Sequence, residues 1–390
     1  MTSFTPTLFL LFVCWCHSAV MATPLHEPDS DGIFVGGWGN WQYVYEPKLL
    51  PLPTQATVEH AHGIIIYDNR LIITYQDSVN TSRCLLQWPS LQNLTVMPDF
   101  IGPGEALCSG VPHGLRLSLE YENEASIVRP YLYHANNEQT LHKTTLDGEI
   151  VWSRHGRPGR HTIDGGVVEP DREELPYKPT WMATSSSWFS PYVYLADGYG
   201  SNRIFILFKA NGTLVTTNST NGQAIFGGMG SKHGQFQTCH AIAWDERVHQ
   251  WVVCDRENHR LEYFEPTDGT ITSSASASAI TFDYSHTVSH EPYLQRPCNI
   301  RIQATDGMAI VPALEGTVGI LDPDNNLVSL VNVSAVLGEH YGFWHPHDAH
   351  FAPGTNGDFI LVTWNPGRIG YFRRVGRYAE TKPTEASTTR

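Results

Sequence analysis

Residues 239–264 read CHAIAWDERVHQWVVCDRENHRLEYF, two apolar runs joined by a short polar stretch. Val, Ile, Trp and Tyr concentrate in the runs, and the charged residues lie between and after them, so the segment predicts two strands and a turn. His240 stands at the head of the first predicted strand. This position decides the fold because a residue in the same setting recurs along the chain.

Six segments share one pattern, a small or proline residue, then a key residue, then an apolar strand. They are AHG (61–63), PHG (112–114), PTW (179–181), CHA (239–241), PCN (297–299) and PHD (346–348). Their spacing of roughly fifty to seventy residues suits units of four strands. Six such units predict an all-β fold, a six-bladed β-propeller over residues 33–376. Residues 33–47 precede the first unit and are expected to supply the outer strand of the last blade.

The first strand of each propeller blade lines the central channel, so the key residues would form a ring around the axis. His113, His240 and His347 belong to alternate units, about 120° apart in a sixfold ring. Three imidazoles with an open fourth position are the arrangement of catalytic zinc, which predicts a zinc site on the axis. The alternative is that these histidines only form hydrogen bonds at strand ends.

The composition limits the classes of partner. The formal net charge of −14 argues against nucleic acid and against an anionic membrane surface. Residues 1–22 contain no charged side chain and hold an apolar run followed by small residues, which predicts a secretory signal peptide. A buried first strand or an anchor is the alternative. No later apolar run is long enough to insert in a membrane, and residues 377–390 are expected to be a disordered tail.

A secreted chain would be glycosylated and disulfide-bonded. Five Asn-x-Ser/Thr sequons occur, at Asn80, Asn93, Asn211, Asn218 and Asn332. Five cysteines follow the predicted signal peptide, so at least one thiol stays unpaired within the chain. Cys239 and Cys254 lie near opposite ends of one predicted hairpin and form the favoured pair. Cys84 with Cys108 is a second candidate, which would leave Cys298 over.

Several motifs resemble the lyase domain of peptidylglycine α-amidating enzyme, the peptidyl-α-hydroxyglycine α-amidating lyase, and the wider NHL-repeat propellers. The motifs are PHGL (112–115), ADGYGSNRI (196–204), GQFQTCH (234–240), CDRENHRL (254–261) and HPHDA (345–349). The resemblance implies an NHL-type propeller that cleaves the N–C bond of a C-terminal α-hydroxyglycine, giving a peptide amide and glyoxylate. It implies zinc on His113, His240 and His347.

The resemblance also assigns roles to three further residues. Tyr199 matches the catalytic tyrosine, Arg256 matches an arginine near it, and Asp348 matches an aspartate that binds a structural calcium ion. A nearby arginine and a metal ion would favour the phenolate that a tyrosine base requires.

The chain departs from the family pattern in three ways. Residues 58–63, VEHAHG, contain no arginine where the family has one beside the substrate carboxylate. His345 replaces a methionine next to the metal motif. His62 and Cys298 add candidate ligands to the ring, and with His345 they would suit a second metal or copper in place of zinc.

The motifs leave three functions open. The first is a secreted zinc lyase that acts on a small molecule or a C-terminal peptide. The second is a noncatalytic extracellular module that binds a protein or glycan on the propeller face. The third is a propeller hydrolase or lactonase, although such sites are usually built from carboxylates and amides around calcium.

Overall fold

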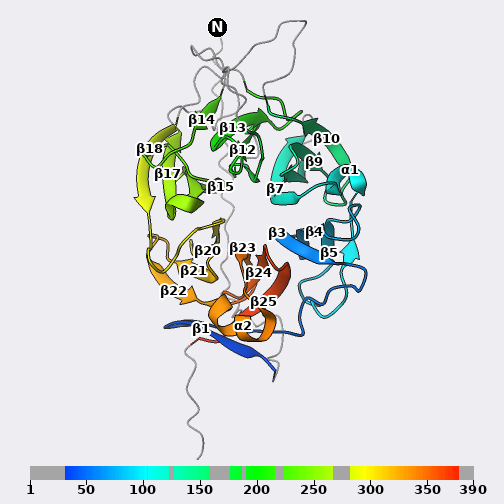
Figure 1. The fold of residues 1–390 in the computed structure, drawn as a ribbon, viewed down its shortest axis with the longest axis vertical. Coiled ribbons are helices and arrows are strands. Elements are labelled where there is room, and N and C mark those ends of the chain that lie inside the picture. Colours follow the sequence, from blue (N-terminus) through cyan, green and yellow to red (C-terminus); the bar gives the residue numbers. More distant parts are fainter. Residues whose placement is uncertain are drawn as a thin grey trace, which may run out of the picture.

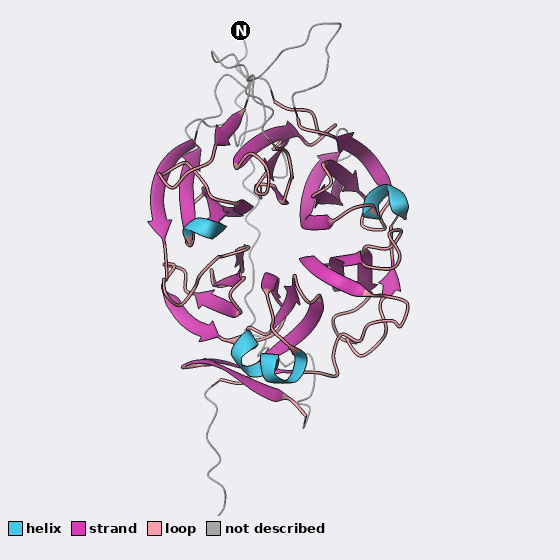
Figure 2. Ribbon diagram, viewed as in Figure 1, coloured by secondary structure: helices cyan, strands magenta, loops and turns pink. Residues whose placement is uncertain are grey.

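The computed structural model describes residues 31–102, 104–122, 127–158, 176–186, 190–215, 224–266 and 282–376. The predicted signal peptide, the predicted C-terminal tail and the sequon at Asn218 lie outside these residues. Within them the regular secondary structure is almost entirely β-strand, joined by turns and loops, as Figure 2 shows. Neither α-helix, α1 (Glu105–Cys108) or α2 (Val333–Tyr341), is long and apolar enough to cross a membrane.

Four sheets of four antiparallel strands are arranged radially around a central axis (Figure 1). The first contains β3 (Val58–Tyr67), β4 (Arg70–Asp77), β5 (Leu85–Trp88) and β6 (Asp99–Phe100). The second contains β7 (Pro112–Glu122), β8 (Ile127–Asn136), β9 (Thr140–Thr144) and β10 (Ile150–His155). The third contains β11 (Trp181–Ala183), β12 (Tyr192–Ala196), β13 (Arg203–Phe208) and β14 (Ile225–Gly227). The fourth contains β15 (Cys239–Asp245), β16 (Gln250–Asp255), β17 (Arg260–Pro266) and β18 (Phe282–Val288).

A fifth sheet of nine strands completes the circle as a β-propeller. One part contains β19 (Arg301–Ile302), β20 (Ala309–Ala313), β21 (Thr317–Leu321) and β22 (Leu327–Val331). The other part contains β23 (Pro346–Phe351), β24 (Phe359–Thr363), β25 (Arg368–Arg374) and β2 (Trp41–Tyr45). Strand β1 (Ile33–Trp38) joins the two parts.

The N-terminal hairpin closes the ring, as the sequence predicted. Strand β2 pairs with β25, so that Tyr43 lies opposite Arg374 and Tyr45 opposite Phe372. Strand β1 meets β22 through a single register pair, Gly36 with Val331. The first and the last strands of the described residues are therefore held in one sheet. Such closure leaves no long sheet edge exposed at the junction.

The middle strands are apolar on both faces because each sheet packs between two neighbours. All five residues of β12 (YVYLA) and of β24 (FILVT) are buried. A strand with one face in water would alternate buried and exposed residues instead. Continuous apolar runs in this sequence thus mark strands that are covered on both sides.

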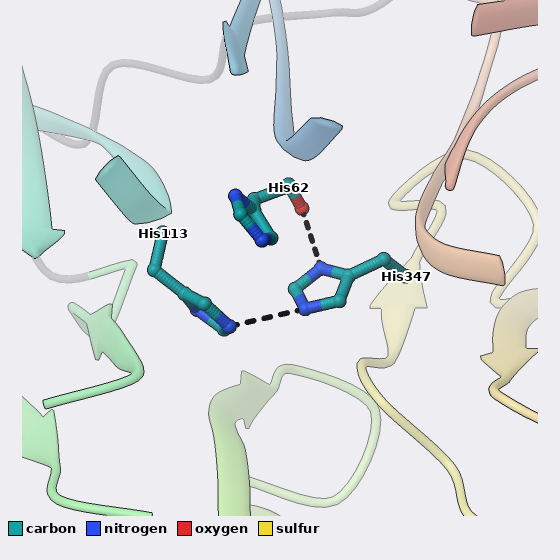
Figure 3. A group of neighbouring side chains, drawn as sticks. All are labelled: His62, His113 and His347. Carbon is teal, nitrogen blue, oxygen red and sulfur yellow. Dashed lines mark hydrogen bonds between the residues drawn. The ribbon is translucent and has the colours of Figure 1, made fainter. Parts of the chain in front are cut away.

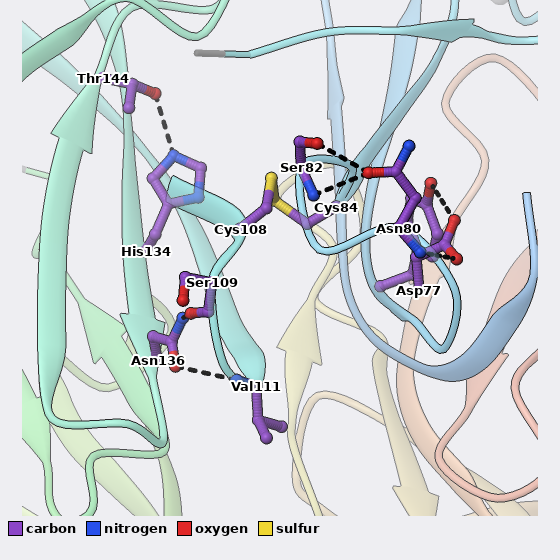
Figure 4. The surroundings of a disulfide bond; sticks show 11 residues. Asp77, Asn80, Ser82, Cys84, Cys108, Ser109, Val111, His134, Asn136 and Thr144 are labelled. Atoms are coloured by element: carbon purple, nitrogen blue, oxygen red, sulfur yellow. Dashed lines mark hydrogen bonds between the residues drawn. A yellow bond between two sulfur atoms is a disulfide. The ribbon is translucent and has the colours of Figure 1, made fainter. Parts of the chain in front are cut away.

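A disulfide joins Cys84, next to β5, to Cys108 at the end of α1 (Figure 4). The other candidate pair was wrong, since Cys239, Cys254 and Cys298 are free and buried. The reason is the register of the hairpin. Cys254 lies opposite Ala241, while Cys239 lies opposite Asp255.

We expect the double substitution C84A/C108A to lower the free energy of unfolding by about 3 kcal/mol, because the bond closes a loop in the unfolded chain. Urea denaturation measures this loss. Reductant should destabilise the unsubstituted protein by a similar amount and leave the variant unchanged. Equal unfolding midpoints for the two proteins would contradict the expectation.

The buried imidazole of His134 makes stability depend on pH. Its Nε2 donates to Thr144 Oγ1 at 2.9 Å, and burial followed by the nearby His142 lowers its pKa to about 3. The unfolded chain binds a proton at this histidine below about pH 6.5, so the stabilisation present at pH 7 is lost as pH falls. We expect H134Q to remove about 2 kcal/mol of the stability difference between pH 7 and pH 5. Parallel stability–pH curves for the two proteins would contradict this role.

Candidate functional site

Each key histidine occupies a β-bulge in the innermost strand of its blade. The pairing of β3 with β4 passes from Ala61 to Gly63, and that of β7 with β8 passes from Pro112 to Gly114. His62 and His113 are therefore the bulged residues, which have no partner in the strand register. The same interruption occurs at His240 in β15 and at His347 in β23. A bulge re-aims a side chain that the regular alternation would direct at a sheet face. Here it allows the imidazoles to meet on the axis.

Glycine after the histidine permits the blades to approach closely at this level. A Cβ on Gly114 would lie 2.5 Å from the carbonyl oxygen of Thr180, and one on Gly63 would lie 2.7 Å from Cβ of Leu115. A larger residue would push the starts of neighbouring inner strands apart. The glycines that follow His62 and His113 are thus explained by packing between blades.

The Nδ1 atoms of the four histidines bind main-chain carbonyls of the next blade. The pairs are His62 with Pro112 at 2.7 Å, His113 with Thr180 at 2.7 Å, His240 with Cys298 at 2.7 Å and His347 with His62 at 2.9 Å. A carbonyl only accepts, so each Nδ1 carries the proton and donates. The unprotonated Nε2 atoms are left with lone pairs available to a ligand.

Three of these imidazoles form a compact group around the axis, as Figure 3 shows. His62, His113 and His347 offer ligand atoms that all lie within 4.8 Å of one another. Nε2 of His113 is 3.1 Å from Nε2 of His347. Two lone pairs at that distance repel unless a proton or a cation lies between them. Neighbouring nitrogens on a tetrahedral zinc ion are about 3.3 Å apart, so these two nitrogens fit such a metal.

Burial keeps the group neutral. Burial, followed by the charges of neighbouring imidazoles, lowers the pKa of His62 and of His113 well below the usual value. Burial lowers the pKa of His347 to about 4. A metal binds the neutral imidazole, so at pH 7 no proton has to leave before an ion enters.

His240 belongs to the same ring but contacts the candidate catalytic tyrosine. Its ring centroid lies 5.0 Å from that of His113 and 4.7 Å from that of His347. Nε2 of His240 lies 3.1 Å from the hydroxyl of Tyr199, which donates to it. Arg256 Nη1 donates to the same hydroxyl oxygen at 2.9 Å. The structure therefore brings Tyr199 and Arg256 together, beside the metal-binding group.

The environment of Tyr199 favours the protonated phenol. Burial raises its pKa above the usual value, and the adjacent Arg256 acts in the opposite direction without reversing the shift. The guanidinium is itself paired with Glu257, whose Oε1 accepts from Arg256 Nε at 2.9 Å. At neutral pH the hydroxyl proton thus remains on Tyr199 and points to His240.

A cavity of about 660 Å³ opens from this group at one end of the channel. Tyr199 and Arg256 line it together with Lys178 and Arg296. Arg296 forms ion pairs with Glu257 and Glu315, both at 2.9 Å or less. Within the described part of the chain, the exposed amine of Lys178 has no ion-pair partner. The cavity therefore contains one cation that is free to meet an anion.

Two further candidate ligands lie near the ring without joining the group of three. His345 lines the cavity and its Nδ1 donates to the carbonyl of Leu314 at 3.0 Å. Cys298 is fully buried, and burial raises the pKa of its thiol to about 12. A thiol ligand must be deprotonated, so this environment does not favour a metal thiolate. Cys298 contributes its main-chain carbonyl to His240 instead.

The surroundings of Asp348 do not fit the calcium ion that the resemblance implied. One carboxylate oxygen accepts from Arg301 Nη2 at 2.7 Å and from the amide of Ile64 at 2.8 Å. The other accepts from Asn299 Nδ2 at 2.6 Å and from Arg301 Nε at 3.2 Å. Calcium requires several oxygen ligands, whereas these partners are donors. The guanidinium supplies the positive charge at this carboxylate.

Sequence reasoning placed His62 second to His240 among the ligands, and the geometry groups His62 with His113 and His347. The sequence contained a signal for this grouping, since His62 in AHG (61–63) follows the same pattern as His113 in PHG (112–114). The spacing of about 120° between alternate blades favours His240 as a ligand. The hydrogen bond between His240 and Tyr199 joins two different blades, so no local sequence pattern predicts it.

Comparison with known proteins identifies no family for the chain. No protein-family profile and no curated protein matches it. Many solved structures are similar, among them the crystal structure of BBS1N in complex with ARL6DN, soaked with lead. That chain is 11% identical, the alignment covers 83% of this chain and 95% of that chain, and the TM-score is 0.43. A similarity of this size supports no conclusion about function.

We expect the protein to retain about one equivalent of zinc after dialysis, and the substitutions H62A and H113A to abolish retention. H240A should retain the metal, because Nε2 of His240 accepts a hydrogen bond from Tyr199 and is not needed as a ligand. Elemental analysis of the purified proteins measures this difference, with H249A at an exposed position as the matched control. Loss of metal in H240A together with retention in H62A would restore the alternate-blade ligand set. An unsubstituted protein without bound transition metal would exclude a metal site.

Proposed function

We propose that the protein is a secreted zinc-dependent lyase similar to the peptidyl-α-hydroxyglycine α-amidating lyase, on a six-bladed propeller of NHL type. The observation that carries this proposal is the contact of Tyr199 with both Arg256 and His240 beside three converging imidazoles. A metal group next to an oriented acid–base residue, at the floor of a cavity, is the arrangement of a hydrolytic or lyase site. A noncatalytic binding module does not require an acid–base residue beside a metal group.

Two further features support parts of the proposal. The nine-stranded sheet divides at β1 into two groups of four strands, which with the four separate sheets suits six blades. The Cys84–Cys108 disulfide suits an oxidising compartment such as the secretory pathway.

The cavity suits a substrate with a terminal carboxylate. Residues 58–63 lack the arginine that the related lyases place beside the substrate, but Lys178 lines the same cavity and is free to bind an anion. Trp364, His60 and His345 form an aromatic wall, with Trp364 5.5 Å from His60 and 5.7 Å from His345 between ring centroids. An acyl group of the peptide would pack against this wall.

Cleavage needs a proton to move from the hydroxyl of the substrate to its amide nitrogen. The oxygen of Tyr199 accepts the hydroxyl proton while its own proton moves to Nε2 of His240, so the phenol stays neutral and His240 holds the extra proton until it returns through Tyr199 to the amide nitrogen. Arg256 holds the phenol oxygen in place. The carbonyl of glyoxylate forms as the C–N bond breaks, and its electron pair goes to nitrogen. Protonation of that nitrogen returns the proton and releases the amide. A zinc ion on the imidazoles would supply a Lewis acid that makes a bound hydroxyl more acidic.

We expect the zinc-loaded protein to release glyoxylate from α-hydroxyhippurate, and Y199F to lower kcat by about 100-fold or more because the proton acceptor is lost. A colorimetric glyoxylate assay measures both rates. Y199F should keep its metal and its unfolding temperature. Y293F, at an exposed tyrosine, serves as the matched control and should retain full activity.

The assay also separates this proposal from a noncatalytic module. A metal-loaded protein that forms no glyoxylate would reject the lyase. Full activity in Y199F would reject the role of the tyrosine while leaving the metal site in place.

A further inference from the structure

A second cavity, of about 470 Å³, lies at the opposite end of the propeller channel. The order of residues along the inner strands shows that the two cavities lie at opposite ends. Strand β7 presents His113 to the first cavity and Arg116 to the second, and β23 presents His347 to the first and His350 to the second. The two cavities share no lining residue, and Arg301, which is paired with Asp348, belongs to the second. The second cavity is therefore separate from the proposed lyase site.

Arg116 is the unusual residue of this cavity. Its Nε atom is buried and has no hydrogen-bond partner in the part of the chain that the structure describes. No carboxylate among those residues lies within ion-pairing distance of it. Burial, followed by the nearby charge of Arg301, lowers the pKa of Arg116 to about 10, so the guanidinium is still charged at neutral pH. A partly buried cation with an orphaned donor lacks an acceptor.

The other charged residues of the cavity do not supply that acceptor. Arg301 is bound to Asp348 at 2.7 Å, and Arg247 is bound to Asp245 at 2.6 Å. Glu246 also lines the cavity, and its side chain extends at an exposed position. Burial lowers the pKa of His350 to about 4, so this imidazole is neutral at pH 7. Among the described residues, Arg116 therefore makes no direct contact with a carboxylate, although the charges of Asp348 and Glu246 act on its guanidinium at longer range.

The rest of the cavity wall is largely apolar. Ile65, Leu117, Trp244 and Ile302 belong to it. A single unpaired guanidinium next to aliphatic and aromatic surface matches a ligand with one negative charge and a short hydrocarbon part. A phosphate, with up to two charges and no apolar part, matches it less well.

We infer that the second cavity binds a small organic monocarboxylate, with the carboxylate on the Arg116 guanidinium and the hydrocarbon part against Ile65, Leu117 and Trp244. This site is independent of the metal group and of the reaction proposed at the other end of the channel.

Titration calorimetry with butyrate tests the inference, with inorganic phosphate and 1-butanol as comparison ligands. Butyrate should bind more tightly than either comparison ligand, and R116Q should weaken butyrate binding at least about 10-fold, as expected for loss of a charge-assisted contact. R70Q, at an arginine outside the cavity, should bind like the unsubstituted protein. Equal affinity in R116Q, tighter binding of phosphate or no binding of butyrate would overturn the inference.

Two additional measurements keep the outcome decisive. Butyrate should shift an arginine Nε–H resonance of the unsubstituted protein in 15N NMR spectra, which needs no variant that might fold poorly. Metal-free H113A should bind butyrate with unchanged affinity, because the two cavities are separate. A loss of butyrate binding in H113A would show that the anion binds at the metal end and would overturn the site at Arg116, while leaving the lyase proposal intact.

Discussion

The site depends on one interaction, the hydrogen bond from a histidine Nδ1 to a carbonyl of the next blade. It occurs four times, and the bond from His347 to His62 joins the last blade to the first. Each bond fixes the tautomer, the ring orientation and the distance between two blades together. The same contact that holds the propeller at its axis therefore leaves Nε2 with its lone pair toward the channel.

This arrangement has a cost that a ligand can offset. The Nε2 atoms of His113 and His347 lie 3.1 Å apart, and their lone pairs repel each other because the proton of each ring is on Nδ1. An ion shared between them replaces repulsion by coordination. His240 avoids the same cost because Tyr199 donates to its Nε2. Four equivalent imidazoles are thus divided between a group that suits a metal and one that orients a hydroxyl.

The channel has two chemically different ends. At one end, neutral imidazoles adjoin Tyr199 and cationic side chains; at the other, Arg116 lies in a mainly apolar cavity. Arg301, which lines the second cavity, is paired with Asp348, the carboxylate where the resemblance implied calcium. A guanidinium delivers its charge through directed N–H bonds and needs no ring of oxygen ligands. The two ends can therefore bind different ligands while one fixed ion pair joins two blades.

The all-β propeller, the N-terminal strand that closes the last blade and the histidines at strand starts could be predicted, because they follow from repeat spacing and from apolar runs buried on both faces. The division of the imidazoles could not be predicted, since a bulge and a contact between blades set the direction of each ring. The same limit applied to Cys239 and Cys254, because the register of β15 on β16 places Cys239 opposite Asp255 and Cys254 opposite Ala241. It applied also to Asp348, because its partner Arg301 belongs to another blade and no local pattern reveals that contact.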